Sequence, residues 1–153
     1  MSLSLTQSKM VEFLENIKTQ GETFICMLWG TVYADASLYV KESKLLSGTY
    51  GVSGSPNERF CYIGLTDKSL YVVAVAPLDT TAIVGSFKFS FDELTRLIIR
   101  KGLLGTRTVE VAGNHNVKLT VKPISLGTDI NDQKTRMVAF MAEIEKLKGS
   151  GGY

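Results

Sequence analysis

The stretch Arg59–Pro77, RFCYIGLTDKSLYVVAVAP, decides the fold. It contains two apolar runs separated by the short polar segment TDKS, and both runs are rich in aromatic and β-branched residues, which suit the pleated, half-buried surface of a β-sheet. Asp67 favours a reversal between the runs because its carboxylate can bond the backbone just downstream. The pattern predicts an antiparallel hairpin. Because an isolated hairpin is only marginally stable in water, further strands or a helix must bury one of its faces.

Segments with helical periodicity stand on both sides of the strand-rich region. The first predicts an amphipathic helix that ends at Gly21. Its apolar residues recur at intervals of three and four, at Met10, Phe13, Leu14 and Ile17. The second predicted helix follows Asp132, which is a suitable N-cap. Its apolar stripe comprises Met137, Phe140, Met141, Ile144 and Leu147.

Between the two helices the sequence predicts six to eight strands. Thr23–Tyr33 is expected to be one long strand with Gly30 as a bulge or bend inside it. Phenylalanines alternate with polar residues in TTAIVGSFKFSF (80–91), which is typical of a strand with one buried face. A further strand is expected at Leu94–Arg100, and TRTVEVAGNHNVKLTVK (106–122) predicts a second hairpin around its GN turn.

The segment between Ala34 and Asn57 gives weaker signals. SLYVKESKLL (37–46) is compatible with a strand or with a short helix. SGTYGVSGSPN (47–57) is rich in Gly, Ser and Pro and predicts a loop.

The order of these elements predicts a mainly β fold of the α+β class. We expect an antiparallel sandwich or partly open barrel whose last helix covers an open end or face. Residues 1–21 are expected to form an N-terminal helical extension, and residues 22–148 the domain. The tail GSGGY, residues 149–153, has no core-forming content and is predicted to be disordered. The apolar stripe of the first helix must be buried on its own domain or on a neighbouring chain, so we also expect a homo-oligomer.

Composition argues against several classes of protein. The chain has 153 residues, 44% of them hydrophobic, which suits one domain with a core, and no run approaches the ~20 apolar residues of a membrane-spanning helix. A net charge of +2 argues against a nucleic-acid partner. The start MSLSLTQSK has no export pattern, so we expect a cytoplasmic protein. Cys26 and Cys61 lie in apolar runs without CxxC spacing, and we expect buried, reduced thiols.

No group of residues predicts catalysis. His115, in the turn AGNHN, is the only histidine and is interpreted as a solvated turn residue, so neither a metal site nor a Cys–His dyad is indicated. The adjacent carboxylates of Asp92 and Glu93 would point to opposite faces of a strand, and we interpret them as a turn or strand-edge pair. GTYGVSG lacks the lysine and the following helix of a phosphate-binding loop. We therefore expect no enzyme, no cofactor and no metal.

Three segments resemble a known family. YIGLTDKSLYVV (62–73) resembles the hairpin of bacterial pleckstrin-homology-like (PH-like) domains and of the related GRAM-type modules. FSFDELTRLIIRKGLLGTRTVEV (89–111) is similar to the element that follows in these domains, and AFMAEIEKL (139–147) to their single C-terminal helix. The resemblance spans Glu22 to Lys148 and implies a barrel of about seven strands in two near-orthogonal sheets, capped by a helix.

The sequence departs from this family at two points. The N-terminal helix lies outside the PH-like core. Phosphoinositide-binding members carry clustered Lys and Arg around their first loop, whereas the same region here has only Lys41 and Lys44, separated by Glu42, before Arg59. The resemblance therefore implies a binding module and does not carry over a lipid headgroup site.

The segment RLIIRKGLLGTR, residues 96–107, is the remaining candidate site. Cations flank an apolar tip, and the candidate residues are Arg96, Arg100, Lys101, Leu103, Leu104 and Arg107. Our first hypothesis is a non-catalytic PH-like interaction module that binds a protein partner. The alternative is a peripheral module that binds anionic membranes through this hairpin. A solvated edge strand with both leucines folded inward would carry neither function.

Electrostatic attraction alone gives only weak membrane contact. Each basic residue near an anionic surface contributes about 1 kcal/mol, so four contribute about 4 kcal/mol before screening, which is near millimolar affinity. A stable membrane-binding module would need insertion of Leu103 and Leu104 or a specific headgroup site, and no pattern indicates the latter. We therefore expect little binding to anionic vesicles at physiological salt, and any residual binding should fade as salt rises.

Overall fold

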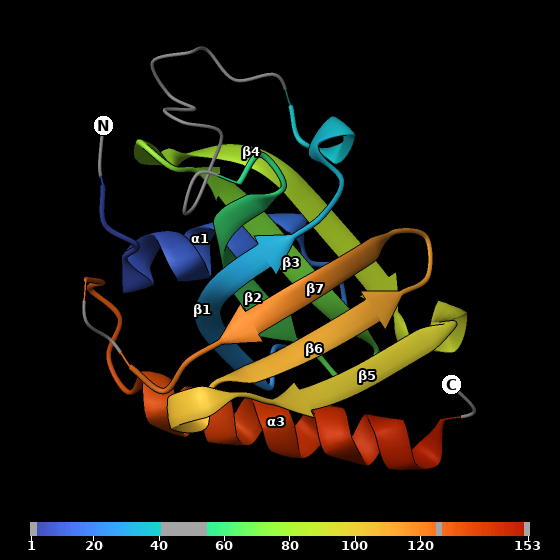
Figure 1. Cartoon of the computed structure of the whole chain (residues 1–153). Helices are drawn as coiled ribbons and strands as arrows, with labels where there is room; N and C mark the ends of the chain where they lie inside the picture. Colours follow the sequence, from blue (N-terminus) through green and yellow to red (C-terminus); the bar gives the residue numbers. More distant parts are fainter. Residues whose placement is uncertain (1–2, 41–54, 125–126, 152–153) are drawn as a thin grey trace.

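One antiparallel sheet organises the computed structural model, which describes residues 3–40, 55–124 and 127–151 (Figure 1). Within these residues seven strands occur in the order β4-β3-β2-β1-β7-β6-β5. They are β1 (Cys26–Tyr33), β2 (Glu58–Leu65), β3 (Ser69–Ala76), β4 (Asp79–Ser90), β5 (Arg96–Lys101), β6 (Arg107–Ala112) and β7 (Asn116–Val121). Helix α1 (Gln7–Ile17) precedes the sheet and helix α3 (Gln133–Ser150) follows it. The predicted mainly β fold with two flanking helices is confirmed.

Several predicted boundaries differ from the structure. Helix α3 continues to Ser150, so the first two residues of the predicted disordered tail are helical. Phe91 lies in a short 3-10 turn, Phe91–Glu93, and is not part of β4. Ala36–Leu38 forms another 3-10 turn. The remaining predictions for residues 41–54, including those on Lys41 and Lys44, lie outside the described residues.

The predicted hairpin consists of β2 and β3, which pair from Cys61 opposite Ala74 to Leu65 opposite Leu70. Its turn is organised by Thr66 and not, as predicted, by Asp67. The Thr66 hydroxyl accepts hydrogen bonds from the backbone N–H groups of Lys68 and Ser69, at 3.1 and 3.0 Å. A threonine hydroxyl can replace the carboxylate of an Asx turn in this way.

Strand β3 is buried on both faces, which explains its uninterrupted apolar sequence. One face lies in the main core, and the other is covered by α1 through its apolar stripe, including Met10 and Leu14 (Figure 1). Two buried tyrosines on the α1 side of the sheet hold the two ends of this helical segment. The Tyr62 hydroxyl accepts a hydrogen bond from the Thr6 N–H and the Tyr71 hydroxyl accepts one from the Thr19 N–H, both at 3.0 Å. The stripe of α1 is thus buried on its own sheet, which removes the reason given above for self-association.

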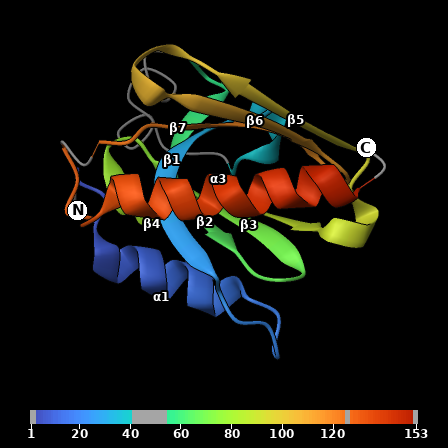
Figure 2. The ribbon, with the colours of Figure 1, turned by 90° about the horizontal axis from the view of Figure 1, so that it is seen from below.

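The main core lies inside the bend of the sheet. Seen from below, α3 lies between the half of the sheet that contains β5, β6 and β7 and the half that contains β2, β3 and β4 (Figure 2). Core side chains come from both halves and from one stripe of α3. The buried residues of that stripe in the core are Met137, Phe140, Met141 and Ile144. The closing helix therefore covers the open end of the bent sheet, as predicted.

Polar contacts fix α3 to β1. The buried Gln133 side chain donates to the Trp29 carbonyl at 2.9 Å and accepts from the Trp29 N–H at 3.4 Å. Arg136 donates to the Met27 carbonyl at 3.2 Å. Asp132 occupies the predicted N-cap position, but its φ of 61° is left-handed and its side chain makes no capping hydrogen bond. The start of α3 is thus held by a strand and not by its cap.

Gly30 lies where β1 joins the two halves of the sheet. Strand β1 pairs with β2 over its whole length and with β7 from Thr31 to Tyr33. A Cβ atom on Gly30 would lie 2.5 Å from the Thr120 carbonyl oxygen and 3.0 Å from a Val121 methyl carbon. The pairing with β2 is regular at this position, so Gly30 is not the predicted bulge. Glycine is required here because the β7 backbone approaches closely.

We expect Gly30→Ala to lower the free energy of unfolding by about 2 kcal/mol, because the added methyl group must displace backbone at the junction. Gly149→Ala is the matched control, since a Cβ atom at Gly149 meets nothing within 4 Å. Urea denaturation followed by circular dichroism measures both variants. Equal stability of the two variants would contradict the packing argument.

Candidate interaction site

The basic segment predicted as one site is divided between two faces of the sheet. Successive side chains of a strand alternate between faces. Leu97 is buried in the core and Ile99 packs against it, so Lys101 shares their face of β5. Arg96 and Arg100 point to the opposite, outer face. The sequence therefore predicted the right residues for a basic hairpin but combined two surfaces into one.

On the outer face, Arg96 and Arg100 surround one carboxylate. Their guanidinium groups lie 3.7 and 3.9 Å from Glu110 of the neighbouring strand β6. Glu110 is also directly opposite Lys118 of β7. An open depression of about 480 Å³ at this place is lined by Tyr33, by apolar side chains and by charged residues of both signs. Two cations and two carboxylates line this depression, which disfavours a strongly anionic ligand there.

On the inner side, a groove of about 420 Å³ separates the β5–β6 turn from α3. Lys101, Arg107 and Lys134 contribute three cations to its lining, and Glu145 the one carboxylate. The apolar part of the lining comprises Pro123, Met137, Val138, Met141 and Ala142. The α3 residues of this groove could not be predicted from the sequence, because only the tertiary structure places that helix beside the hairpin.

The turn between β5 and β6 presents two leucines to solvent. Leu103 is 87% exposed and Leu104 is 95% exposed. Leu104 has φ 55° and ψ 36°, a left-handed conformation that is uncommon for a leucine, and Gly105 follows with φ 80°. The interpretation in which both leucines fold inward is wrong. An apolar tip in a strained backbone conformation is typical of a functional surface.

Strand β5 is an edge of the sheet. The Gly102 N–H donates to the Thr106 carbonyl at 2.8 Å. Because backbone hydrogen bonds alternate along an antiparallel strand, the N–H and C=O groups of Arg100, Ile98 and Arg96 point toward β6. The backbone N–H and C=O groups of the intervening residues, Leu97, Ile99 and Lys101, face the open side. Within the described parts of the chain, these groups have no hydrogen-bond partner there.

The residues considered for catalysis lie apart from these surfaces. His115 lies in the predicted turn but is half-buried, with its ring packed edge-on against Phe87 at 5.6 Å between centroids. Asp92 and Glu93 are exposed in their 3-10 turn. In the described ranges, no three His, Cys, Asp or Glu side chains gather to hold a metal ion. No described helix has the length and apolar character needed to cross a membrane.

Glu22 forms a buried polar contact that the sequence analysis missed. It lies between α1 and β1, accepts a hydrogen bond from the Thr66 hydroxyl at 2.6 Å and lies 3.9 Å from the Lys88 ammonium group. Burial raises the pKa of Glu22, but hydrogen bonds from Thr66 and other neighbours and the charge of Lys88 outweigh it, so the pKa is lowered from its usual 4.5. This carboxylate connects the helical extension to the β2–β3 turn.

The fold is similar to that of solved structures with little sequence identity. The hSac2 domain from the human phosphoinositide phosphatase Sac2 shares 10% identity, with a TM-score of 0.52, over 95% of this chain and 82% of that chain. The C-terminal domain of an unknown protein from Leishmania infantum shares 13% identity, with a TM-score of 0.45, over 91% of this chain and 97% of that chain. No family model and no curated protein sequence matches the chain. The likeness concerns the fold alone.

We expect both cysteines to be unreactive in the native protein. Burial raises the pKa of Cys26 to about 12, with the Glu143 charge acting in the same direction, and burial also raises the pKa of Cys61. The thiolate is the reactive form, so little of it exists at neutral pH. Titration with Ellman's reagent should detect neither thiol in the native protein and both in denaturant. Rapid labelling of both native thiols would contradict this.

We expect Glu22 to make stability depend on pH. Because its folded pKa lies below its usual value, the carboxylate stabilises the protein above pH 4.5, and this contribution is lost as the pH falls through the lowered pKa. The difference in unfolding free energy between wild type and Glu22→Gln should therefore shrink between about pH 5 and pH 2. Glu93→Gln, which removes an exposed carboxylate, is the control. A difference independent of pH would show that the charge of Glu22 is not involved.

Proposed function

We propose that the protein is a non-catalytic, PH-like interaction module that binds a protein partner by adding an extended segment of the partner to β5. The open edge of β5, where three residues direct backbone N–H and C=O groups away from the sheet, carries the proposal. Such an edge binds peptides through main-chain hydrogen bonds. The PH-like assignment is supported by the resembling hairpin, the seven strands and the closing helix.

The other edge strand, β4, is less suited to this role. The Val40 N–H already donates to the Val84 carbonyl of β4 at 2.7 Å. The pairing of β4 with β3 also shifts register between Ala74 and Ala76. An occupied position and an irregular ladder both discourage the addition of another strand. We therefore assign the partner to β5.

The charge of β5 favours a partner that contains Asp or Glu. The strand RLIIRK carries Arg96, Arg100 and Lys101 and no acidic residue. Opposite charges on neighbouring strands stabilise their pairing and like charges oppose it. Antiparallel pairing of two copies of β5 centred on Ile98 would place Arg96 of each copy opposite Arg100 of the other. The proposed partner is therefore a different, acidic chain, and β5 disfavours self-association.

The proposal includes a cytoplasmic location and no catalytic residue. The two cysteines are free, and reduced thiols are usual in the cytoplasm. The groove beside α3 offers space for partner side chains next to the β5–β6 turn. Neither feature requires a cofactor.

A proline at position 101 tests the added strand. The Lys101 N–H faces the open side, so Lys101→Pro removes one donor to the partner and leaves pairing with β6 intact. Lys101→Ala removes the same charge and keeps the N–H. Peptides of about ten residues, selected from a random displayed library on the wild-type chain, supply the ligands. We expect them to bind Lys101→Pro about fivefold more weakly than Lys101→Ala, the loss of one hydrogen bond.

Fluorescence anisotropy with the labelled peptides gives the dissociation constants. Circular dichroism verifies that both variants remain folded. Selected peptides that bind the proline and alanine variants equally, or a selection that enriches no acidic sequence, would exclude strand addition at β5.

A further inference from the structure

Four exposed apolar side chains gather at one end of the molecule from three separate segments. Leu103 and Leu104 are 87% and 95% exposed in the β5–β6 turn, Ile124 is 48% exposed after β7, and Val138 is 63% exposed on α3. A Cβ atom at Gly105, next to Leu104, would lie 3.1 Å from Pro123, next to Ile124. Gly105, Pro123 and Val138 line the same groove. The four side chains therefore belong to one surface, which we call the leucine end.

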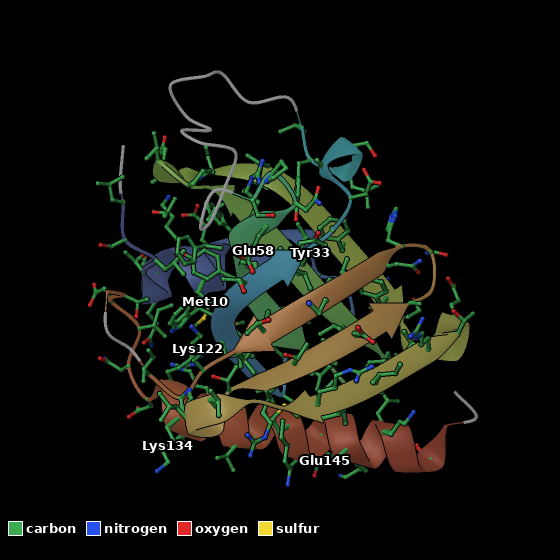
Figure 3. All side chains as sticks on the ribbon, in the orientation of Figure 1. Met10, Tyr33, Glu58, Lys122, Lys134 and Glu145 are labelled. Atoms are coloured by element: carbon green, nitrogen blue, oxygen red, sulfur yellow. The ribbon has the colours of Figure 1, made fainter. Side chains whose placement is uncertain are left out.

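Cations surround the leucine end. Lys101 and Arg107 stand on either side of the turn, and Lys134 lines the groove from α3. Lys122 is exposed on the segment that leads to Ile124, and Figure 3 shows Lys122 and Lys134 at the same end of the molecule. Among the ion pairs formed by described residues, none includes these four cations. Their charge is available to an anionic partner.

The backbone of the tip keeps Leu104 in solvent. Its left-handed conformation costs energy for a leucine, and burial of the side chain does not offset that cost. The turn is nevertheless closed by hydrogen bonds from the Thr106 N–H to the Leu103 carbonyl at 3.0 Å and from the Gly102 N–H to the Thr106 carbonyl. The chain thus holds two leucines outward on a hydrogen-bonded turn.

We propose that the leucine end docks on the surface of an anionic lipid bilayer. Leu103 and Leu104 enter the interface, and Lys101, Arg107 and Lys134 contact lipid phosphates and anionic headgroups. This goes beyond the proposed function, because it assigns a second ligand to a surface that shares Lys101 with the β5 edge and otherwise lies outside it.

A bilayer fits this surface better than a protein does. The two leucines project from the tip of a hairpin, which a fluid interface accepts without a matching pocket. Charges and apolar residues are arranged as in peripheral membrane anchors, with the cations around the apolar centre. Arg96 and Arg100 contribute less, because they point to the outer face of β5, away from the groove, and share the Glu110 carboxylate. The sequence-based expectation of little vesicle binding counted charge alone, and the exposure of both leucines is the reason to revise it.

Co-sedimentation of the full chain with vesicles tests the proposal. The vesicles contain phosphatidylcholine alone or with about 30 mol% phosphatidylserine, at physiological and at high salt. One variant combines Leu103→Ser with Leu104→Asn, since asparagine tolerates the left-handed conformation. A second combines Lys101→Gln with Lys134→Gln. The matched controls are Arg96→Gln with Arg100→Gln, which removes the same charge from the outer face, and Ile83→Ser, which removes an exposed apolar residue from β4.

We expect the wild-type chain to bind the anionic vesicles and not the neutral ones. The leucine variant should lose at least about tenfold in partitioning, since two apolar side chains no longer leave water. The Lys101/Lys134 variant should bind more weakly at physiological salt, by a margin that fades at high salt. Both controls should remain near wild type, and circular dichroism verifies folding.

Three results would overturn the proposal. The first is a wild-type chain that does not bind anionic vesicles. The second is a leucine variant that binds as well as wild type, and the third is an Arg96/Arg100 control that loses as much as the Lys101/Lys134 variant. Loss of binding to the selected peptides in the leucine variant, with no vesicle binding by wild type, would assign the leucine end to a protein partner instead.

Discussion

The close approach of β7 to Gly30 is the constraint on which the rest of the structure depends. Strand β1 joins the half of the sheet that contains β2, β3 and β4 to the half that contains β5, β6 and β7. The Thr120 carbonyl oxygen of β7 lies only 2.5 Å from the position that a Cβ atom on Gly30 would take. The same strand holds α3, through Gln133 on the Trp29 backbone and Arg136 on the Met27 carbonyl. One strand thus fixes both the β5–β6 hairpin and the helix that faces it. The groove between them exists because both are positioned from β1.

The elements of this fold could be predicted from the sequence because their signals are local. Alternating apolar residues indicated the hairpins, and a period near 3.6 indicated both helices. The uninterrupted apolar run of β3 is consistent with burial on both faces, but it does not show which element covers the second face. Only the structure shows the hydroxyls of Tyr62 and Tyr71 bonded to backbone at the two ends of the α1 segment. The N-terminal helix is therefore an integral layer of the domain and not an appendage.

The candidate site could be predicted only in part. The cluster of cations in residues 96–107 indicated the basic hairpin. Strand alternation places Arg96 and Arg100 on one face and Lys101 on the other, and this separation follows from the sequence once β5 is taken as a strand. The contribution of Lys134 and Val138 was not readable, because nothing local relates α3 to a turn some thirty residues earlier. Sequence patterns specify which residues are exposed together on one element. Tertiary packing decides which elements share a surface.

The two proposed ligands would be coupled through Lys101. This residue ends β5, where its N–H faces the open edge, and its ammonium group belongs to the cations of the leucine end. An acidic partner strand on β5 would neutralise charge that an anionic bilayer also uses, and its own carboxylates would be repelled by the lipid surface. Each ligand should therefore weaken the other, and linkage requires the same factor in both directions. A module of this design would release an acidic partner on reaching an anionic membrane, and the coupling would diminish as salt screens the charges.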